Sequence, residues 1–563
     1  RQRQMCIRDR CILYSLYRIK AEKQKSAKTL KQLCNKAKNH NTVKDGYMTL
    51  WIVLVAYLCL MVGIGAYYRK KNSGTADYVL GGRNIGSWFT AFAYGTSYFS
   101  AVIFVGYAGK FGWNYGVSAS WVGIGNAVIG SLFAWLVLGK RTQIMSKHLD
   151  ARTMPEFFER RYNSKGLKLA AALIIFVFLI PYTASAFNGL SRLFERAFHI
   201  DYAVCIAAMG VITAVYVIVG GYKATALNDF IQGIIMLVGI VAVIINVLGQ
   251  HGGLSDSLDA LGKIPAASGE TQMFNSLFGP DPINLVGVVI LTSLGTWGLP
   301  QMVTKFYTIK DSKAIKQGTI ISTIFAFVVA GGCYFQGGFG RLFVKADELG
   351  NPEGGFDAII PQMMETLPEL LFGIVIVLVL SASMSTLASL VLTSSSTLTL
   401  DMIKPAMKGK MDEKKEVLTM RIFVAVFLLI SCVIAIITLE NPQTVISTLM
   451  SISWGALAGA FIAPFMWGLY MKNITKAAVW ISFISGVAIT VGHMFYFTLG
   501  NHQLVIGGLA VHSPINAGAF AMLFSLVIVP VVSFFTKKPE KSEVDEIFSC
   551  LDNSEQEKIA ETV

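Results

Sequence analysis

About thirteen apolar segments, most of them ~20 residues or longer, follow one another along this 563-residue chain and limit the folds open to it. A helix of about 20 residues spans the ~30 Å hydrocarbon core of a bilayer. A transmembrane barrel would instead need alternating segments of about ten residues, which the sequence does not show. Only 15% of the residues are charged, against roughly 25% in soluble proteins. The sequence therefore predicts an all-α polytopic membrane protein with about 13 transmembrane helices.

The predicted spans form one membrane domain over residues 48–536, followed by a short polar cytoplasmic tail at 537–563. We expect no catalytic or signalling domain in a tail of this length. The spans are placed at 49–68, 86–108, 118–139, 167–192, 202–220, 224–248, 283–307, 317–340, 370–398, 419–438, 443–470, 475–498 and 514–535.

The first 47 residues carry 13 basic and 3 acidic side chains and no sustained apolar period. Met48 stands directly before the first span. We expect residues 1–47 to be a spurious or disordered basic leader and the native start to be Met48. The remaining chain is close to balanced, so the formal net charge of +14 does not indicate a nucleic-acid-binding protein.

Lysines and arginines between the spans set the expected orientation, because short cytoplasmic loops are enriched in them. With Met48 outside, the cytoplasmic segments hold 29 of these residues and the opposite segments hold six. The sequence predicts a multi-pass protein of the cell membrane with its N-terminus outside and its C-terminus in the cytoplasm.

Two acidic segments on the outer side, 249–281 and 341–369, are either short interfacial helices or lids, or plain solvated loops.

Two of the predicted spans contain residues that interrupt helices midway. Gly95–Ala101 lies inside 86–108, and Gly295–Pro300 lies inside 283–307. Non-helical backbone survives at this depth only where protein or a cavity satisfies its polar groups. The two spans lie five apart, as the first helices of two inverted five-helix repeats around a midplane site would. Gly and Pro also kink ordinary transmembrane helices, so a functional break and a simple kink are both open.

Three hydroxyl side chains share one face of the 370–398 span with Ala382. Counted from Ala382, the residues Ser385, Thr386 and Ser389 follow at i+3, i+4 and i+7. Hydroxyls and carbonyls freed at a break supply the hard oxygens that Na⁺ needs. The same side chains could instead bond to their own helix or pack as small residues. Asp229, near the inner end of its span, is either a functional charge or an acid at a helix N-terminus.

Several runs, taken in order, resemble the sodium:solute symporter family over about residues 49–535. They are Tyr78–Arg83, Thr153–Phe158, Gly220–Ala224 with Asn228–Gln232, Gly298–Pro300 and Met384–Thr386. The resemblance implies a leucine-transporter-like core of two inverted five-helix repeats plus extra helices. It also implies a secondary active transporter in which Na⁺ and solute each favour the other's bound state.

The resemblance further implies a main sodium site made of three backbone carbonyls and two hydroxyls. The carbonyls are those of Thr96, Phe99 and Ala382, and the hydroxyls are those of Ser385 and Thr386.

Some members of the family hold a second sodium ion through an acid that corresponds to Asp229 and hydroxyls that correspond to Ser385, Ala388 and Ser389. Alanine at position 388 lacks the hydroxyl, so Asp229 and Ser389 form an incomplete possible second site.

Aromatic and hydroxyl side chains are the candidates for the solute site, although aromatic residues in helices also serve as packing. The candidates are Tyr98, Ser100, Tyr182, Thr296, Trp297 and Trp454. Around Gly298–Pro300 and Lys310–Ala314 the chain is most similar to the sodium/pantothenate branch. The proline carriers have aromatic residues where Thr292 and Thr296 align, although Tyr182 matches another of their aromatic residues. Ile103 aligns with a glutamine of the sugar carriers, which argues against a sugar. The N-terminal ends of broken helices suit an anionic solute.

We therefore expect a sodium-coupled symporter that imports a small carboxylate-bearing solute such as pantothenate, a monocarboxylate or proline. A solute-sensing membrane receptor and an uncoupled uniporter are the alternatives. An enzyme is not expected, because the sequence shows no nucleophile and base set, metal cluster or phosphate loop. Na⁺ is the expected cofactor, and solute, Na⁺ and the lipid bilayer are the expected partners, with no nucleic acid and the oligomeric state open.

Overall fold

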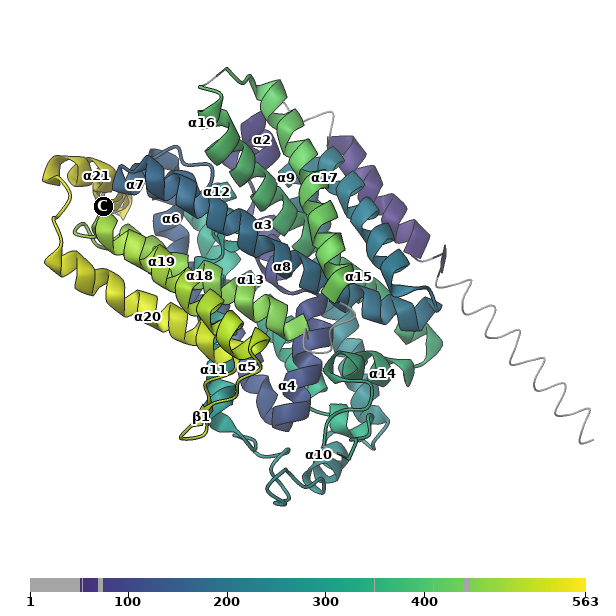
Figure 1. The fold of residues 1–563 in the computed structure, drawn as a ribbon. Helices are drawn as coiled ribbons and strands as arrows, with labels where there is room; N and C mark the ends of the chain where they lie inside the picture. Colours follow the sequence, from purple (N-terminus) through teal and green to yellow (C-terminus); the bar gives the residue numbers. More distant parts are fainter. Residues whose placement is uncertain are drawn as a thin grey trace, which may run out of the picture. The chain divides into compact units, whose positions relative to one another are not determined.

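A computed structural model describes residues 51–52, 54–68, 74–348, 350–408, 410–438 and 446–562, with only the backbone described over 553–562 (Figure 1). The predicted leader at 1–47 lies outside these residues. The chain divides into two units, Arg1–Tyr57 and Leu58–Val563. The described residues of the first unit are helical. The second unit holds all the elements that follow.

The first part of this unit consists of helices only. They are α2 (Thr75–Leu80), η1 (Gly81–Arg83), α3 (Ser87–Tyr98), η2 (Val102–Tyr107), α4 (Ala108–Tyr115), η3 (Gly116–Ala119), α5 (Ser120–Gly125), η4 (Asn126–Phe133), η5 (Trp135–Gly139), α6 (Lys140–His148), α7 (Met154–Tyr162), α8 (Lys165–Phe198) and α9 (Tyr202–Gly249).

The remaining part adds further helices and one small antiparallel hairpin. These elements are α10 (Leu254–Gly262), α11 (Pro282–Gly298), α12 (Pro300–Thr308), α13 (Ser312–Gly337), η6 (Gly340–Leu342), η7 (Phe356–Ala358), α14 (Ile359–Glu365), α15 (Glu369–Thr397), η8 (Leu398–Ile403), α16 (Lys404–Ala406), α17 (Glu413–Ile437), α18 (Ile446–Tyr470), α19 (Lys476–His493), η10 (Met494–Leu499), β1 (Val505–Ile506), β2 (Leu509–Ala510), α20 (Pro514–Phe535) and α21 (Lys541–Thr562).

The helical membrane fold predicted from the sequence is confirmed. Within the described residues, nine helices are long and apolar enough to cross a membrane, or ten if the bent pair α11 and α12 is one span. Two of these long helical runs change direction at glycines in the left-handed region, Gly116 (φ 63°) and Gly221 (φ 62°). A shorter apolar helix occupies Leu54–Tyr68. The total of 13 spans stays a prediction.

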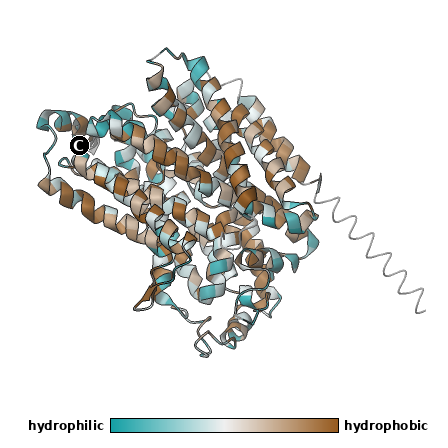
Figure 2. Cartoon of the chain, viewed as in Figure 1, coloured by the Kyte–Doolittle hydropathy of each residue, from teal (hydrophilic) through white to brown (hydrophobic). Residues whose placement is uncertain are grey.

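The short elements of the second unit sort to its two ends. Figure 1 shows α2, α7, α16 and α21 at one end of the helices and α10, α14 and β1 at the other. We call these the α7 end and the α14 end. Hydrophobic residues follow the long helices between them, as Figure 2 shows. Because α10 and α14 fall within the two acidic segments, the expectation of short helices there is confirmed.

The break predicted in the 86–108 span is confirmed. Helix α3 ends at Tyr98, because the backbone of Phe99 is extended (φ −81°, ψ 105°). Ser100 then starts the next helix: its Oγ accepts from the Val102 N–H at 3.2 Å, and its carbonyl accepts from two further N–H groups at 3.0 Å. The chain continues as the π-helix η2.

The break predicted in the 283–307 span is also confirmed. Leu299 is extended (φ −76°, ψ 124°), Pro300 begins α12, and the two halves are bent by 47°. A Cβ on Gly298 would lie 2.8 Å from the Cα of Ala458, so glycine at this position allows α11 to pack closely on α18.

Helices α4 and α13 touch through their backbones. A Cβ on Gly112 would overlap the carbonyl of Gly337, and a Cβ on Gly337 would overlap the carbonyl of Ala108. Neither obstacle is a flexible side chain, so neither can move aside cheaply. This contact fixes α4, which follows the first break, against α13.

We expect Gly112→Ala to lower the melting temperature of the purified protein, because overpacking costs about 1–3 kcal/mol. Gly331→Ala on α13 is the matched control, since a Cβ there meets no atom within 4 Å. Thermal unfolding in detergent measures both variants. Equal melting temperatures would contradict the close contact.

Candidate functional site

Five oxygen atoms meet where the break after α3 faces α15. Ser385 Oγ lies 3.0 Å from the carbonyl oxygens of Thr96 and Ala382, either of which can accept its proton. Thr386 Oγ1 lies 3.2 Å from the Thr96 carbonyl and 3.4 Å from the Phe99 carbonyl. All five residues are buried. The structure thus brings together the five residues of the predicted main sodium site.

The break explains why these carbonyls are available. The last carbonyls of a helix have no N–H partner within it. The N–H of Phe99 still donates to Gly95 at 3.3 Å, so the Thr96 carbonyl lies beyond the last backbone bond of α3. The hydroxyls of Ser385 and Thr386 occupy that place. The hydroxyl of Thr96 itself is buried without a hydrogen-bond partner among the described residues.

The oxygen cluster is electrically neutral, because carbonyls and hydroxyls carry only partial charges. Hard neutral oxygens can replace the hydration shell of an alkali cation without holding it too tightly to leave. The donor set at this break therefore fits a small monovalent cation such as Na⁺.

Three of the predicted solute-site side chains lie in one buried group. The rings of Tyr182 and Trp454 meet edge to face with centroids 5.8 Å apart. Tyr98, the last residue of α3, lies near enough to Tyr182 for the two groups to affect each other electrostatically, although no hydrogen bond joins them. Among the described residues the Tyr98 hydroxyl has no hydrogen-bond partner, and the Tyr182 hydroxyl and Trp454 indole N–H have none apart from each other.

The other three predicted solute-site residues form hydrogen bonds at the breaks. Ser100 caps η2, as described above. Thr296 Oγ1 donates to the Gly130 carbonyl at 3.0 Å, and Trp297 Nε1 donates to the Ile129 carbonyl at 2.9 Å. Both acceptors belong to the π-helix η4. These contacts hold the second break in place and engage the polar atoms of Thr296 and Trp297.

Sequence reasoning missed two further buried polar groups, Tyr334 on α13 and Asn126 on η4. Asn126 Oδ1 accepts from Ser293 at 3.3 Å, whereas its amide nitrogen and the Tyr334 hydroxyl have no described partner apart from each other. No local signal marks them, because a tyrosine or asparagine in an apolar span looks the same whether it packs or binds.

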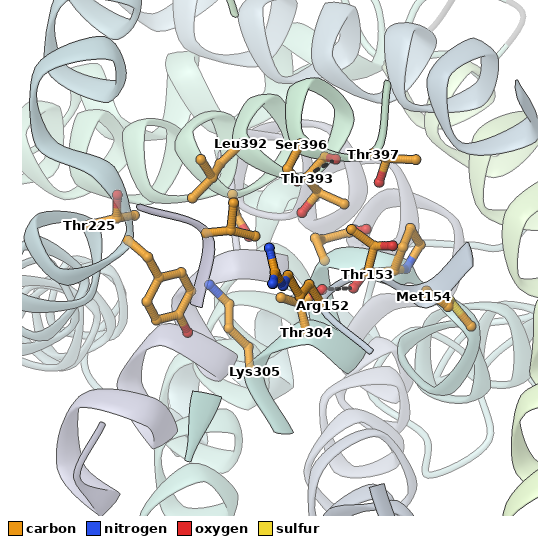
Figure 3. Close-up of a pocket in the computed structure, with 15 residues that line it drawn as sticks. Arg152, Thr153, Met154, Thr225, Thr304, Lys305, Leu392, Thr393, Ser396 and Thr397 are labelled. Atoms are coloured by element: carbon orange, nitrogen blue, oxygen red, sulfur yellow. Dashed lines mark hydrogen bonds between the residues drawn. The ribbon is translucent and has the colours of Figure 1, made fainter. Parts of the chain in front are cut away.

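A polar cavity lies toward the α7 end, and Figure 3 shows Lys305 and Arg152 pointing into it from different elements. Thr225 and Ser389 also line the cavity. Asp229 lies one turn beyond Thr225 on α9, fully buried, and neither carboxylate oxygen has a hydrogen-bond partner among the described residues. The two residues of the possible second sodium site, Asp229 and Ser389, are therefore both buried in this region.

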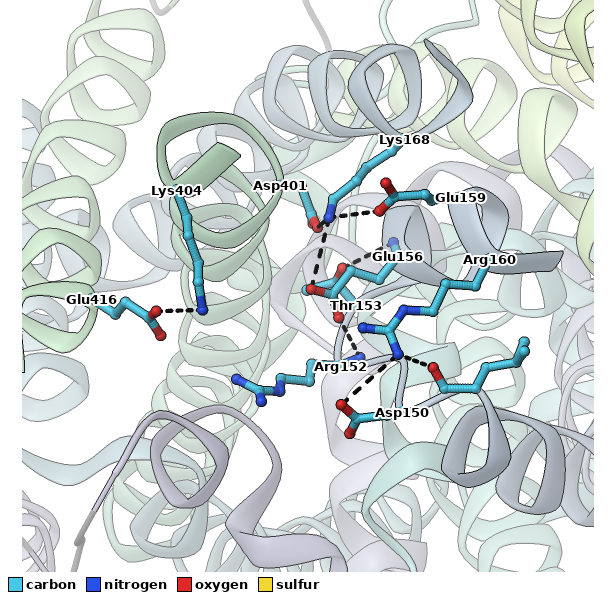
Figure 4. A network of polar contacts seen from close by, with 11 residues as sticks. Asp150, Arg152, Thr153, Glu156, Glu159, Arg160, Lys168, Asp401, Lys404 and Glu416 are labelled. Carbon is cyan, nitrogen blue, oxygen red and sulfur yellow. Dashed lines mark hydrogen bonds and ion pairs between the residues drawn. The ribbon is translucent and has the colours of Figure 1, made fainter. Parts of the chain in front are cut away.

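A network of ion pairs ties the elements of the α7 end together (Figure 4). The ammonium group of Lys168 on α8 lies 2.8 Å from Glu159, 3.5 Å from Asp401 and 3.8 Å from Glu156. Thr153 caps α7 by accepting from the Glu156 N–H at 3.2 Å. The run Thr153–Phe158 that carries the resemblance thus begins a helix and anchors it to α8 and η8.

At the α14 end, η7 contacts the start of α18. Asp357 Oδ2 accepts from the Ile446 N–H at 3.2 Å, and Lys110 Nζ donates to Ser447 Oγ at 3.0 Å. Burial raises the pKa of the Asp357 carboxyl, while the Ile446 N–H and the charge of Lys110 act in the opposite direction. These contacts join α4, η7 and α18 on the side of the breaks that faces the α14 end.

Comparison with known proteins gives three findings. The model of the sodium:solute symporter family matches residues 78–486. A sodium/proline symporter of Staphylococcus aureus (strain JH9) is 30% identical over 506 residues, which cover 88% of this chain and 94% of that protein. The substrate-bound outward-open structure of a Na⁺-coupled sialic acid symporter matches with a TM-score of 0.70 at 16% identity, covering 87% of this chain and 99% of that one. This likeness confirms the leucine-transporter-like fold.

We expect Tyr98→Phe to leave the melting temperature unchanged or slightly higher in the absence of solute, because it removes a buried hydroxyl that lacks a partner. Tyr107→Phe is the matched control. Its hydroxyl lies 2.9 Å from Ser451 Oγ, so its loss should cost about 1 kcal/mol. Thermal unfolding of the two variants checks this, and equal destabilisation would reveal a structural partner for Tyr98.

Proposed function

The chain belongs to the sodium:solute symporter family, and on that premise we propose that it imports a small carboxylate-bearing solute in symport with Na⁺. Pantothenate, a monocarboxylate and proline are the solutes we favour. The observation that carries the proposal is the neutral oxygen cluster between the first break and α15.

The proposed sodium ligands are the carbonyls of Thr96, Phe99 and Ala382 and the hydroxyls of Ser385 and Thr386. An ion bound there contacts the broken end of α3 and the face of α15 together, so its binding free energy favours one arrangement of the two. Tyr98 lies between two of the proposed carbonyl ligands in sequence, which supports a solute site beside the same break. Ion and solute then each raise the affinity for the other, by equal factors.

The proposed solute site is built from the buried group of Tyr98, Tyr182 and Trp454. Among the described residues these hydroxyl and indole groups have no hydrogen-bond partner outside the Tyr182 and Trp454 contact, so they can donate to a carboxylate. Helices that begin at a break also present the positive ends of their dipoles. Ser100, Thr296 and Trp297 support this site by fixing the two breaks.

We place the protein in the cell membrane with the α7 end and the C-terminus in the cytoplasm and the N-terminus outside. The excess of lysines and arginines in the segments at that end supports this orientation.

A receptor or an uncoupled uniporter would use the same solute site without an ion gradient. The match to a sodium/proline symporter and to a Na⁺-coupled symporter structure favours coupling for this chain. Transport measurements separate the three functions.

We expect the purified protein in proteoliposomes to take up one solute from a panel of labelled pantothenate, proline and monocarboxylates, and only under an inward Na⁺ gradient. Liposomes with K⁺ on both sides are the control. Equal uptake in both conditions would indicate a uniporter, and binding without uptake would indicate a receptor. Either result would overturn the proposed symport.

We expect Thr386→Ala to weaken the apparent affinity for Na⁺ about tenfold or more, which corresponds to about 1.4 kcal/mol. The loss of stability should stay near the cost of one neutral hydrogen bond, about 1 kcal/mol. Ser395→Ala on the same helix is the matched control. Its hydroxyl is buried but lies 3.2 Å from the carbonyl of Leu392 in its own helix. Na⁺ activation of uptake and the melting temperature are measured for both variants. Unchanged Na⁺ activation in Thr386→Ala would refute the site.

A further inference from the structure

Asp229 is a carboxylate without a described hydrogen bond in the interior of the protein. It is fully buried on α9, and neither oxygen has a hydrogen-bond partner among the described residues. A carboxylate removed from water needs a nearby positive charge, because an uncompensated buried charge costs several kcal/mol. A cation close to Asp229 would stabilise its charged form, which otherwise takes up a proton.

Lys305 is the cationic side chain that acts on Asp229. It lies on α12, the inner half of the second broken span, and is only 2% exposed. Lys305 and Asp229 are near enough for their charges to act on each other, although their charged atoms do not come within 4.0 Å. Its ammonium group lies 5.1 Å from the ring centroid of Tyr222, and it shares a cavity with Thr225 and Ser389. The flexible four-carbon stem of a lysine allows its ammonium group to adjust its position toward the carboxylate.

A second sodium ion fits this place poorly. The family's second site uses hydroxyls at three positions of α15, and one of them is Ala388 in this chain. Of those three positions Ser385 and Ser389 keep a hydroxyl, and the Ser385 hydroxyl already lies in the main oxygen cluster. Only Ser389 is then left at these positions for a second ion, whereas Na⁺ needs about five or six oxygens. Lys305 and Asp229 together are neutral, so an added ion would leave a net positive charge in a buried site.

We propose that Lys305 takes the place of a second sodium ion as the positive charge for Asp229, so that this chain binds a single Na⁺ at the Ser385 and Thr386 site. The proposal rests on the proposed function, because it assumes that the main site binds Na⁺. Lys305 belongs to α12 and Asp229 to α9, so the pair also joins the second broken span to the first repeat without any ion.

The test counts bound ²²Na⁺ per protein molecule, with purified full-length protein in detergent and no solute. We expect one Na⁺ per wild-type molecule, one in Asp229→Asn, and a loss of at least tenfold in affinity in Thr386→Ala. Two ions in the wild type, with one remaining in Asp229→Asn, would overturn the proposal. A single ion that survives in Thr386→Ala and disappears in Asp229→Asn would overturn it as well.

The reverse substitution creates the missing site. We expect Lys305→Met combined with Ala388→Ser to bind two Na⁺, because Asp229 then lacks its lysine and gains a hydroxyl nearby. Lys310→Met with Ala388→Ser is the matched control, since Lys310 is about half exposed and the control should still bind one ion. A count of one in both double variants would show that Lys305 does not exclude the ion.

Melting temperatures of variants that lack one or both charges test the pairing separately from Na⁺ binding, so a variant that fails to fold is recognised. Asp229→Asn alone leaves Lys305 unpaired, so we expect a lower melting temperature in Na⁺-free buffer. The double variant Asp229→Asn with Lys305→Met removes both charges and should recover most of that loss, as a coupled pair requires. Additive losses would contradict the pairing. A folded wild type that binds no ²²Na⁺ would overturn the proposed function, and with it the count of one.

Discussion

Every backbone carbonyl and N–H that leaves a helix inside a membrane must find another partner, and this requirement shapes the protein around both breaks. At the first break the partners are hydroxyls of α15, a helix almost 300 positions further along the chain. Thr386 Oγ1 reaches two of the exposed carbonyls, at 3.2 and 3.4 Å. The same atoms that complete the backbone's hydrogen bonding thereby form the oxygen cluster proposed for Na⁺. Folding and ion binding draw on one set of contacts.

The second break is stabilised in a complementary way. There the side chains of Thr296 and Trp297 donate to carbonyls of η4, at 3.0 and 2.9 Å. A π-helix has wider turns than an α-helix, which makes its carbonyls available to side chains. Tyr94 on α3 donates to the same Gly130 carbonyl at 2.8 Å. The element η4 therefore connects the first broken span to the second, so the two breaks are held at a fixed separation.

The sequence carries enough information to locate both breaks and the hydroxyl face. Glycine, threonine and proline in the middle of apolar spans mark the breaks, and helical spacing places Ser385 and Thr386 on one face. Local patterns carry no information about partners far away in the chain. The acceptors of Thr296 and Trp297 and the proximity of Lys305 to Asp229 depend on tertiary packing. The helix α21 in the polar tail also depends on distant partners. Lys472 Nζ donates to Asp545 Oδ1 at 2.8 Å, and Asn163 Nδ2 donates to Glu543 Oε1 at 3.0 Å.

The contacts at the first break are weaker than the contacts at the α7 end, and this difference affects which parts of the protein can move. A neutral hydrogen bond contributes about 1 kcal/mol, so the hydroxyls at the first break can exchange a carbonyl for a bound ion at little cost. Removing one partner of a buried ion pair costs about 3–5 kcal/mol. Lys168 faces three carboxylates at the α7 end, one of them on the fully buried side chain of Asp401. Helices α7 and α8 and the element η8 should therefore keep their arrangement while the contacts around Thr96 and Thr386 change. Weak neutral contacts at the proposed ion site and strong charged contacts at the α7 end are a distribution that suits reversible ion binding.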